Sequence, residues 1–470
     1  MNATREWYTE SLKDRYALLS FFGKVDYNYA NKYYFSASFR RDGSSRFSPD
    51  NRWGNFFSVG GSWRVTNEEF MKDVSWLDNL VLRTSYGTTG NDKLITRQSN
   101  GKPGAEILYG YQGLYENDNL YTISGLRPST IATPKLQWEK NKQFNIATDF
   151  TIFKDVNATI EYYTRVSDGL LFYKTLPLSA QVGSVSGSNT NIGSLRNSGF
   201  EFTVGATAIR RKNFTWNIDA NLSTLSNKII DLPSEPFFWS NTISKYYMCE
   251  GNSLYDFYAP KTDGIDPETG LVRYLKADGT VVNNPTALNN DDNVKIGSAL
   301  PKVYGSLTNT FYLSGFDLSF MIYYSLGSYM YDYQYYERTR VRYQTSALTD
   351  LVADRWQKPG DIATIPRLTG SNWGSMMGYC DRYVFKNDFL RLRNLTLGYT
   401  IPAKLTKKAG IDKLRIYFSG DNLFTVGPAR GRYVDPETGL SGNNYNGNSE
   451  TDSGVQGGRR IFMGGIQLSF

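Results

Sequence analysis

The chain closes on the stretch RRIFMGGIQLSF, residues 459–470, in which apolar and polar or small residues alternate. One register holds Phe462, Gly464, Ile466, Leu468 and Phe470, and the other holds Gly465, Gln467 and Ser469. A period of two is the side-chain period of a β-strand. We therefore predict a strand with one apolar face that reaches the last residue. An ordinary edge strand could show the same pattern, so the rest of the chain has to decide the fold class.

The same alternation recurs along the chain. In segments 33–40, 200–207, 214–222, 316–324 and 414–419, one face is apolar and the other mostly polar or charged. Strands of a β-sandwich are usually about five or six residues long. Most of these runs are about ten to fourteen residues long, which is the length that a tilted strand needs to cross a bilayer.

This alternation also predicts the direction of each side chain in a membrane-spanning strand. Charge on the lipid side is unfavourable, whereas a barrel lumen is wet. The predicted lipid-facing residues are Phe214, Trp216, Ile218, Phe316, Leu318, Phe320, Ile322, Leu414, Ile416 and Phe418, and the predicted lumen-facing residues are Glu201, Asp219, Asp317 and Arg415.

The links between strands alternate in length. Short links such as YANK, TIFKDV, IRRKN and LSG alternate with stretches that are mostly far longer, near 90–137, 225–302, 327–387 and 425–457. Short turns at one end and long loops at the other are typical of outer-membrane barrels. We predict about thirteen antiparallel strands of a transmembrane β-barrel, near 17–29, 32–42, 54–65, 79–89, 138–150, 156–174, 198–209, 213–224, 303–312, 315–326, 388–401, 413–424 and 458–470.

Histidine is absent from the 470 residues. Without it, no Ser-His-Asp or Cys-His nucleophile and no His-containing zinc or iron site can be built. Paired carboxylates could still do acid–base work, but no spacing of Asp and Glu favours it. We therefore predict that the chain is not an enzyme and has no catalytic residues, metal site or cofactor.

Other features of the composition exclude further classes. The net charge of +7 is spread without long basic runs, which gives little support for nucleic-acid binding. The apolar runs are far shorter than the roughly 18 residues of a spanning helix, and no signal peptide is visible at the start. Cys249 and Cys380 could form a loop disulfide or remain free thiols, and their spacing does not decide.

Several blocks of sequence resemble the barrel of SusC/RagA-type TonB-dependent transporters of Bacteroidetes outer membranes. They are FRRDGSSRFSPDNRWGNFFSVGGSWRVTNEEFM (39–71), WLDNLVLRTSYGTTGND (76–92), GFDLSFMIYYSLG (315–327), DFLRLRNLTLGYTIPAKLTKKAGIDKLRIYFSGDNLFT (388–425) and YVDPETG (433–439). The blocks follow one another in order from about residue 39 to the end of the chain, and their combination is specific.

The resemblance implies a 22-stranded barrel around an N-terminal plug. It also implies import of oligosaccharides or peptides, a SusD-like lipoprotein lid, and energy supplied by the TonB complex through the plug. Residues 1–470 would be the C-terminal portion of such a barrel, with long extracellular loops and without the plug. Strand parity agrees, because thirteen strands with residues 1–16 outside cannot form a whole single-chain barrel of even strand number. The expected location is the cell outer membrane.

Two groups of residues are candidates for function. By the same resemblance, Phe462, Ile466, Leu468 and Phe470 would be the signal that barrel-assembly machinery reads by strand pairing, although they could be merely lipid-facing. In the 327–387 loop, Tyr335, Tyr336, Trp373, Tyr379 and Arg382 are candidates for stacking on sugars or peptides and for hydrogen bonding to them. The alternative is that these aromatic residues pack the loop.

The hexapeptide DPETGL occurs twice, at 266–271 and 435–440. Pro after Asp starts a turn and Gly closes it, so a plain turn is expected. A Ca²⁺ site would need a spaced acidic ladder, which neither copy nor the stretch NNDDN at 289–293 supplies. Two other functions remain open at this stage: a soluble or surface glycan-binding β-protein, and a passive porin.

Overall fold

The computed structural model describes most of the chain. The described residues are 15–94, 106–120, 123–176, 187–232, 235–240, 245–332, 353–367, 380–427 and 458–470, together with 179, 181, 185, 335, 336, 339 and 435–437. No helix in this part of the chain is long and apolar enough to span a membrane.

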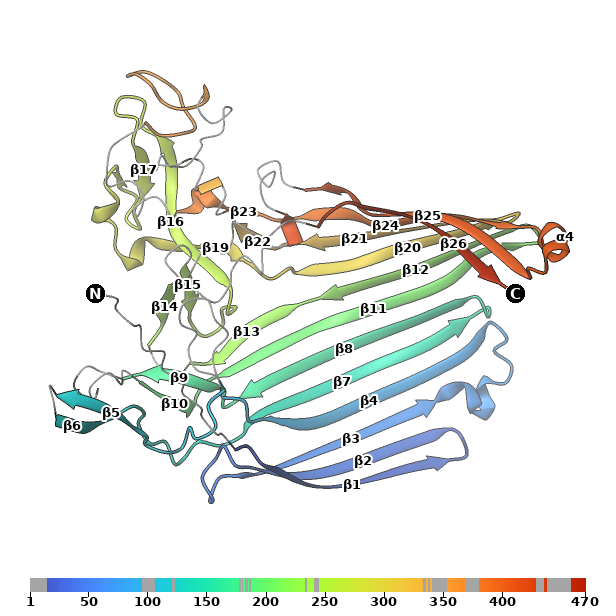
Figure 1. Cartoon of the computed structure of the whole chain (residues 1–470), viewed down its shortest axis with the longest axis horizontal. Helices are drawn as coiled ribbons and strands as arrows, with labels where there is room; N and C mark the ends of the chain where they lie inside the picture. Colours follow the sequence, from blue (N-terminus) through green and yellow to red (C-terminus); the bar gives the residue numbers. More distant parts are fainter. Residues whose placement is uncertain are drawn as a thin grey trace, which may run out of the picture.

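Thirteen long strands form one continuous antiparallel sheet (Figure 1). Its order is β1-β2-β3-β4-β7-β8-β11-β12-β20-β21-β24-β25-β26, so sequence neighbours among the long strands are also neighbours in space. We call this sheet the wall. Its strands are β1 Leu18–Tyr29, β2 Tyr33–Ser44, β3 Trp53–Arg64, β4 Leu77–Asn91, β7 Glu139–Ile152, β8 Val156–Asp168, β11 Ser194–Arg211, β12 Phe214–Thr224, β20 Val303–Leu313, β21 Phe316–Leu326, β24 Phe389–Ile401, β25 Lys413–Val426 and β26 Ile461–Ser469.

The thirteen predicted strands are therefore confirmed, with one correction. The predicted strand 156–174 ends at Asp168, where Gly169 takes a positive φ of 62°. The following residues form β9 (Leu171–Thr175), which pairs with β10 (Gly187–Asn191) as a separate hairpin. Tyr, Phe and Leu continue the alternation past the break, so periodicity alone did not show it.

All short links lie at one end of the wall, which we call the turn end (Figure 1). Three of them, 30–32, 153–155 and 314–315, are links of two or three residues that contain two consecutive residues with positive φ: 30–31, 153–154 and 314–315. This geometry matches the twist of antiparallel strands and closes hairpins tightly. Of the other three described turns, β11–β12 consists of residues 212–213, β3–β4 carries η1 (Val65–Asn67) with η2 (Glu69–Met71), and β24–β25 carries α4 (Ala403–Thr406) with η7 (Lys407–Ala409).

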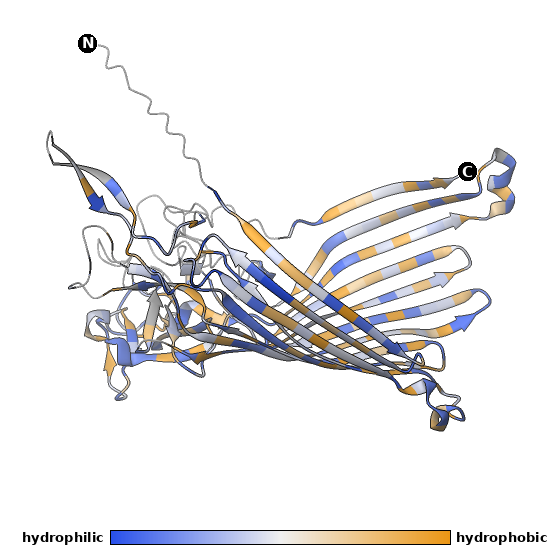
Figure 2. Ribbon diagram, turned by 90° about the horizontal axis from the view of Figure 1, so that it is seen from below, coloured by the Kyte–Doolittle hydropathy of each residue, from blue (hydrophilic) through white to orange (hydrophobic). Residues whose placement is uncertain are grey.

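The strand register places the predicted lipid-facing and lumen-facing sets on opposite faces. Phe316 pairs with Leu313 and Tyr399, and Leu318 pairs with Phe311 and Leu397. Asp317 lies on the other face, where Arg415 binds it. Figure 2 shows the alternation as orange and blue segments along each strand. We call the two faces the apolar face and the polar face.

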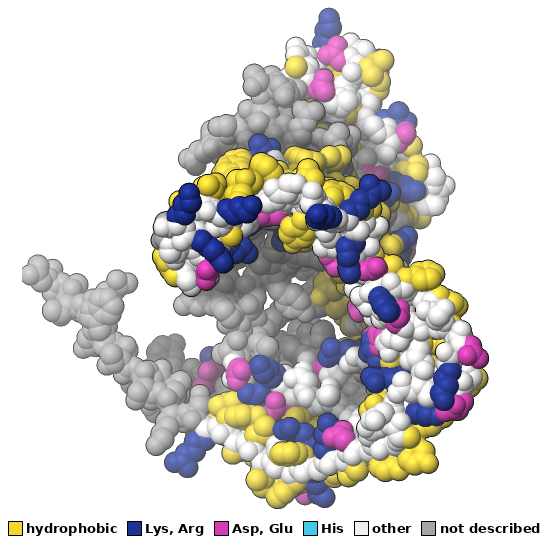
Figure 3. Space-filling model, turned by 90° about the vertical axis from the view of Figure 1, so that its right-hand side faces the viewer, with side chains coloured by type: hydrophobic (Ala, Val, Ile, Leu, Met, Phe, Trp, Pro, Cys, Tyr) yellow, Lys and Arg dark blue, Asp and Glu magenta, His cyan; other side chains and the backbone are white. Residues whose placement is uncertain are grey.

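A β-bulge preserves this separation in β24. The register with β21 shifts between Met321 and Ile322, so that Arg393 is the extra residue opposite them. As a result Leu392 and Leu395 both remain on the apolar face, although an uninterrupted period of two would place them on different faces. The wall curves around an open centre, with apolar side chains along its outer margin (Figure 3).

Smaller sheets stand at the opposite end, which we call the loop end (Figure 1). Their strands are β5 Tyr115–Leu120, β6 Ile123–Pro128, β14 Phe237–Ser240, β15 Lys245–Met248, β16 Asp256–Ile265, β17 Val272–Leu275, β18 Val281–Val282, β19 Asn293–Ser298, β22 Tyr329–Tyr331 and β23 Val384–Lys386, with η4 (Pro285–Ala287), η5 (Asn290–Asp292) and η6 (Asp381–Tyr383). The short strand β13 (Ser226–Asp231) pairs with the loop end of β11 and extends the large sheet there.

Candidate functional site

Two long links, between β12 and β20 and between β21 and β24, fold together at the loop end. Their described residues form what we call the loop body. The backbone N–H and hydroxyl of Thr262 on β16 donate to Asp381 Oδ1 of η6 at 2.9 and 2.7 Å. The indole of Trp356 donates to the Pro267 carbonyl at 2.7 Å. The two links therefore form one folded unit.

The loop body has a buried apolar core. It is formed by Ile265, Val272, Tyr274, Tyr335, Tyr336, Cys380 and Tyr383. The Tyr383 ring is fully buried and lies 5.2 Å from the Tyr336 ring between centroids. Burial raises the pKa of the Cys380 thiol to about 12, so this cysteine is held as an inert thiol. Cys249 and Cys380 are both free, and they form no disulfide.

The predicted substrate-contacting residues lie in different environments. Tyr335 and Tyr336 are 9% and 4% exposed, which places them in the core of the loop body. The guanidinium of Arg382 donates to the Thr364 carbonyl and is partly buried. Trp373 and Tyr379 lie outside the described residues. The two buried tyrosines thus pack the core of the loop body.

The first DPETGL copy forms a turn within the loop body. Asp266 Oδ1 accepts from the Glu268 N–H at 3.0 Å, and Oδ2 accepts from the Thr269 hydroxyl at 2.7 Å. These hydrogen bonds, led by that from Thr269, hold the pKa of Asp266 below its usual value. Gly270 closes the turn at a φ of 68°. The expected plain turn is observed.

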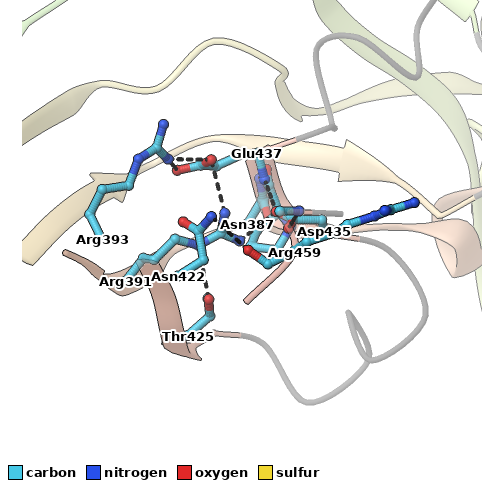
Figure 4. Close-up of polar contacts among 10 residues, drawn as sticks. Asn387, Arg391, Arg393, Asn422, Thr425, Asp435, Glu437 and Arg459 are labelled. Atoms are coloured by element: carbon cyan, nitrogen blue, oxygen red, sulfur yellow. Dashed lines mark hydrogen bonds and ion pairs between the residues drawn. The ribbon is translucent and has the colours of Figure 1, made fainter. Parts of the chain in front are cut away.

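The second copy is attached to the wall (Figure 4). Arg391 on β24 donates through Nη2 to Asp435 Oδ1 at 2.5 Å and through Nη1 to Glu437 Oε2 at 2.9 Å. Its side chain is 3% exposed and that of Asp435 is 9% exposed. The backbone N–H of Gly458 donates to the other oxygen of Asp435 at 2.7 Å. Arg391 thus joins the wall to residues 435–437 of the β25–β26 link, and Asp435 in turn holds Gly458 close to the start of β26.

Charge pairing supports this attachment. Burial alone would raise the pKa of Asp435, but the Glu437 N–H and the Arg391 guanidinium outweigh burial and lower the pKa. Asn387 adds a hydrogen bond from its amide to the Pro436 carbonyl at 2.9 Å. Sequence reasoning missed Arg391. The available signal was the repeated hexapeptide, whose acids need cationic partners when they are buried.

The polar face of the wall carries ion pairs between strands. Arg83 on β4 binds Asp149 on β7 at 2.7 Å and Glu161 on β8 at 3.4 Å. Arg415 on β25 donates through Nε to Asp317 on β21 at 2.9 Å, across the intervening β24. Such charges suit a wet lumen and would be costly on a lipid-facing surface. Among the described residues, no cluster of three or more acids, Cys or His could hold a metal ion.

The last strand lies at one edge of the wall. β26 pairs with β25 over Ile461–Ser469. Phe462, Ile466 and Leu468 are exposed on its apolar face, and Phe470 follows the strand with 83% of its surface exposed. The geometry suits an edge to which another strand could be added.

The comparisons with known proteins decide the family. A family model described as "TonB dependent receptor-like, beta-barrel" matches residues 2–423. The chain belongs to this family. TonB-dependent receptor barrels such as SusC and RagA lie in the outer membrane, so the outer membrane is the location of this chain. The family is one of transporters and receptors, not of enzymes.

Individual relatives agree. TonB-dependent receptor P39 of Formosa agariphila is 30% identical over 91% of the chain and 44% of its own length. TonB-dependent receptor SusC of Bacteroides thetaiotaomicron is 29% identical over 92% of the chain and 42% of its own length. The RagAB peptide transporter structure superposes with a TM-score of 0.79 and 28% identity, over 97% of the chain and 48% of that chain. The chain spans about half the length of the relatives it matches.

Proposed function

We propose that residues 1–470 form the C-terminal portion of a SusC-like TonB-dependent transporter barrel with extracellular loops, and that the complete transporter imports a nutrient. The observation that carries the proposal is the combination of a curved wall, polar on one face and apolar on the other, with a folded loop body at one end. A wall of this kind needs lipid outside and water inside.

The proposed cargo is an oligosaccharide or a peptide. The RagAB structures are described as those of a peptide transporter, and RagAB and SusC are both similar to this chain. The described loop body exposes carboxylates such as Glu268 and Asp278 and amides such as Asn284. Trp373, Tyr379 and Arg382 remain proposed cargo contacts, whereas Tyr335 and Tyr336 would act by supporting the loop body.

The proposed partners act at the two ends of the barrel. A SusD-like lipoprotein would cover the loop end as a lid, with the loop body as its docking surface. The TonB complex would supply energy at the turn end through a plug, which is not among the described residues. A passive porin would need neither partner.

Growth tests this function. A strain that carries the complete transporter would be grown on a panel of single oligosaccharides and peptides as sole nutrient, beside a strain in which loop-body residues 235–300 are replaced by a short linker. We expect loss of growth on one cargo class only, and loss of uptake after the proton-motive force is collapsed. Uptake that survives collapse would indicate a porin, and equal growth of both strains would contradict the proposal.

We also propose that Phe470 is part of an assembly signal. Deleting Phe470 from the complete transporter should lower the amount of heat-modifiable barrel in the outer membrane without changing synthesis. Phe418→Ala is the matched control, because it removes an exposed aromatic from the same apolar face of the neighbouring strand. Equal barrel levels in the deletion and the wild type would show that Phe470 is only a lipid-facing residue.

A further inference from the structure

Arg391 and Arg393 lie on the polar face of β24, close to the loop end. Arg391 pairs with Tyr323 of β21, and Tyr323 shares the polar face with Asp317 because the two are an even number of residues apart. The guanidinium carbon of Arg393, the extra residue of the β24 bulge, lies 5.9 Å from the centre of the same Tyr323 ring. Both arginines therefore face the lumen side of the wall.

The two arginines differ in how many of their N–H donors are used. Arg391 uses all three nitrogens of its guanidinium: Nε donates to the Thr425 hydroxyl at 2.9 Å, and the other two bind the acids of the second hexapeptide. Arg393 donates through Nη1 to both carboxylate oxygens of Glu437, at 2.5 Å for Oε2. Within the described part of the chain, Nε and Nη2 of Arg393 donate to no other group. Arg393 thus keeps N–H donors available to a further acceptor, and it lies on the side of Glu437 away from Asp435 (Figure 4).

An aromatic surface adjoins Arg393 on the same face. Tyr304 on β20 and Tyr323 on β21 are diagonal neighbours, because each pairs with the residue two positions beyond the other. Both tyrosines are partly exposed. Aromatic side chains of this kind provide contact area for sugars and peptides, while a charged residue fixes the orientation of the ligand.

Exposure separates the two ion pairs of this cluster. Arg391 and Asp435 are 3% and 9% exposed, and breaking a buried pair leaves an uncompensated charge. Arg393 and Glu437 are 45% and 26% exposed, and ion pairs in contact with water are weak. The bond between Arg393 and Glu437 is therefore the one that an incoming carboxylate can replace, while Arg391 continues to hold both acids on the wall.

We propose that Arg393 is a lumen-side binding site for a carboxylate group of the cargo, and that Glu437 occupies this site when no cargo is bound. The cargo would then be an acidic oligosaccharide or an acidic peptide, with its rings or side chains on Tyr304 and Tyr323. A planar guanidinium suits this role because it binds a carboxylate through two parallel N–H donors. The inference rests on the proposed import function and adds the charge of the cargo.

Matched probes test this charge preference. The complete transporter in detergent would be titrated calorimetrically with a galacturonic acid hexamer and a galactose hexamer, and with a capped pentapeptide that has a central Glu or a central Gln. We expect the acidic member of at least one pair to bind more tightly. Arg393→Gln should weaken binding of that acidic probe by about tenfold, because a charged hydrogen bond is lost. Glu437→Gln should tighten its binding by about fivefold, because the competing carboxylate is removed.

The opposite signs distinguish a binding site from an ion pair that is only structural, since loosening of the link would weaken binding in both variants. Arg83→Gln and Glu161→Gln are the matched controls, because they remove one cation and one acid from the polar face of β4 and β8, where the side chains are 43% and 21% exposed. Both should keep the wild-type preference, and heat-modifiable migration on a gel reports whether each variant is folded.

Three results would overturn the inference: no preference for the acidic member in either pair, an unchanged preference in Arg393→Gln, or weaker binding of the acidic probe in Glu437→Gln. These results are separate from a failure of the proposed function. Energy-dependent growth on a cargo class, combined with no carboxylate preference in the titrations, would overturn the carboxylate site alone. Equal growth with and without residues 235–300 would contradict the import function, whatever the titrations show.

Discussion

The wall and the loop body place their aromatic side chains in opposite environments. Phe316 and Phe418 on the wall are each 52% exposed, whereas Tyr383 in the loop body is fully buried. Apolar surface on the wall is removed from water by lipid, but in the loop body it must be removed by other side chains. In one chain, apolar side chains are therefore covered by lipid on the wall and by other side chains in the loop body. The change comes where the strands leave the membrane.

The two hexapeptide copies repeat this contrast on a smaller scale. Asp266 accepts hydrogen bonds from Glu268 and Thr269 of its own turn and from Asn283 of the same loop body. Asp435 accepts the equivalent hydrogen bond from Glu437 and is bound in addition by Arg391 of the wall. The local turn is thus encoded by the hexapeptide, whereas the attachment depends on a residue far away in sequence.

The largest effect is expected in the core of the loop body. Tyr383→Ala should destabilise the loop body by about 3–5 kcal/mol, because it leaves a cavity among buried rings. Limited proteolysis should then cut between 235 and 387 while the wall still migrates as a heat-modifiable barrel. Tyr115→Ala, at a position 66% exposed on β5, is the control and should change little. If the wall and the loop body both unfold in Tyr383→Ala, the two regions are not stabilised independently.

A charge on the apolar face should have the next largest effect. Leu397→Arg should lower the stability of the folded barrel in lipid vesicles by about 2–4 kcal/mol, as measured by urea titration. Thr396→Arg places the same charge one residue away on the polar face and should cost far less. If the two variants are equally destabilised, lipid does not cover the apolar face.

The attachment of the second hexapeptide to the wall should contribute less to stability than the apolar face does. Arg391→Met removes charged hydrogen bonds that are worth about 1.5–3 kcal/mol in general. Faster hydrogen exchange of the Glu437 and Gly458 backbone N–H groups, which donate to Asp435, would report local release of the link. Arg393→Met is the control, because Arg393 is 45% exposed and binds only Glu437 of the same pair of acids. Unchanged exchange in Arg391→Met would contradict the attachment.

The smallest effect is the pH dependence of the same attachment. The pKa of Asp435 is lowered in the folded chain. Its stabilising contribution is therefore fully present above the ordinary carboxyl pKa and is lost as pH falls through the lowered value. Exchange at Gly458 should accelerate in this acidic range beyond the intrinsic pH effect. Asp435→Asn should remove that excess, and an excess that persisted in Asp435→Asn would have to be assigned to another group.

Much of the wall could be predicted because the sequence pattern that specifies each strand is local. A period of two specifies a strand and the face of each residue, and the face of Asp317 was predicted in this way. The end of β8 was missed because its apolar register, which includes Ile160 and Tyr162, continues past Gly169 as Phe172. The roles of Tyr335, Tyr336 and Arg391 could not be predicted, since they depend on links that meet only in the folded chain. An aromatic residue in a long loop looks the same in sequence whether it contacts cargo or packs a core.

Cysteine labelling along β21 tests the central claim most directly. In the complete transporter with Cys249 and Cys380 replaced by Ser, single cysteines would be placed at Asp317, Leu318, Ser319 and Phe320, and the barrel would be labelled in membranes. The account predicts that a membrane-impermeant maleimide reacts at 317 and 319, and that a lipid-soluble maleimide reacts at 318 and 320. Uniform reaction with the water-soluble reagent at all four positions would contradict a membrane-spanning wall with one lipid-facing side.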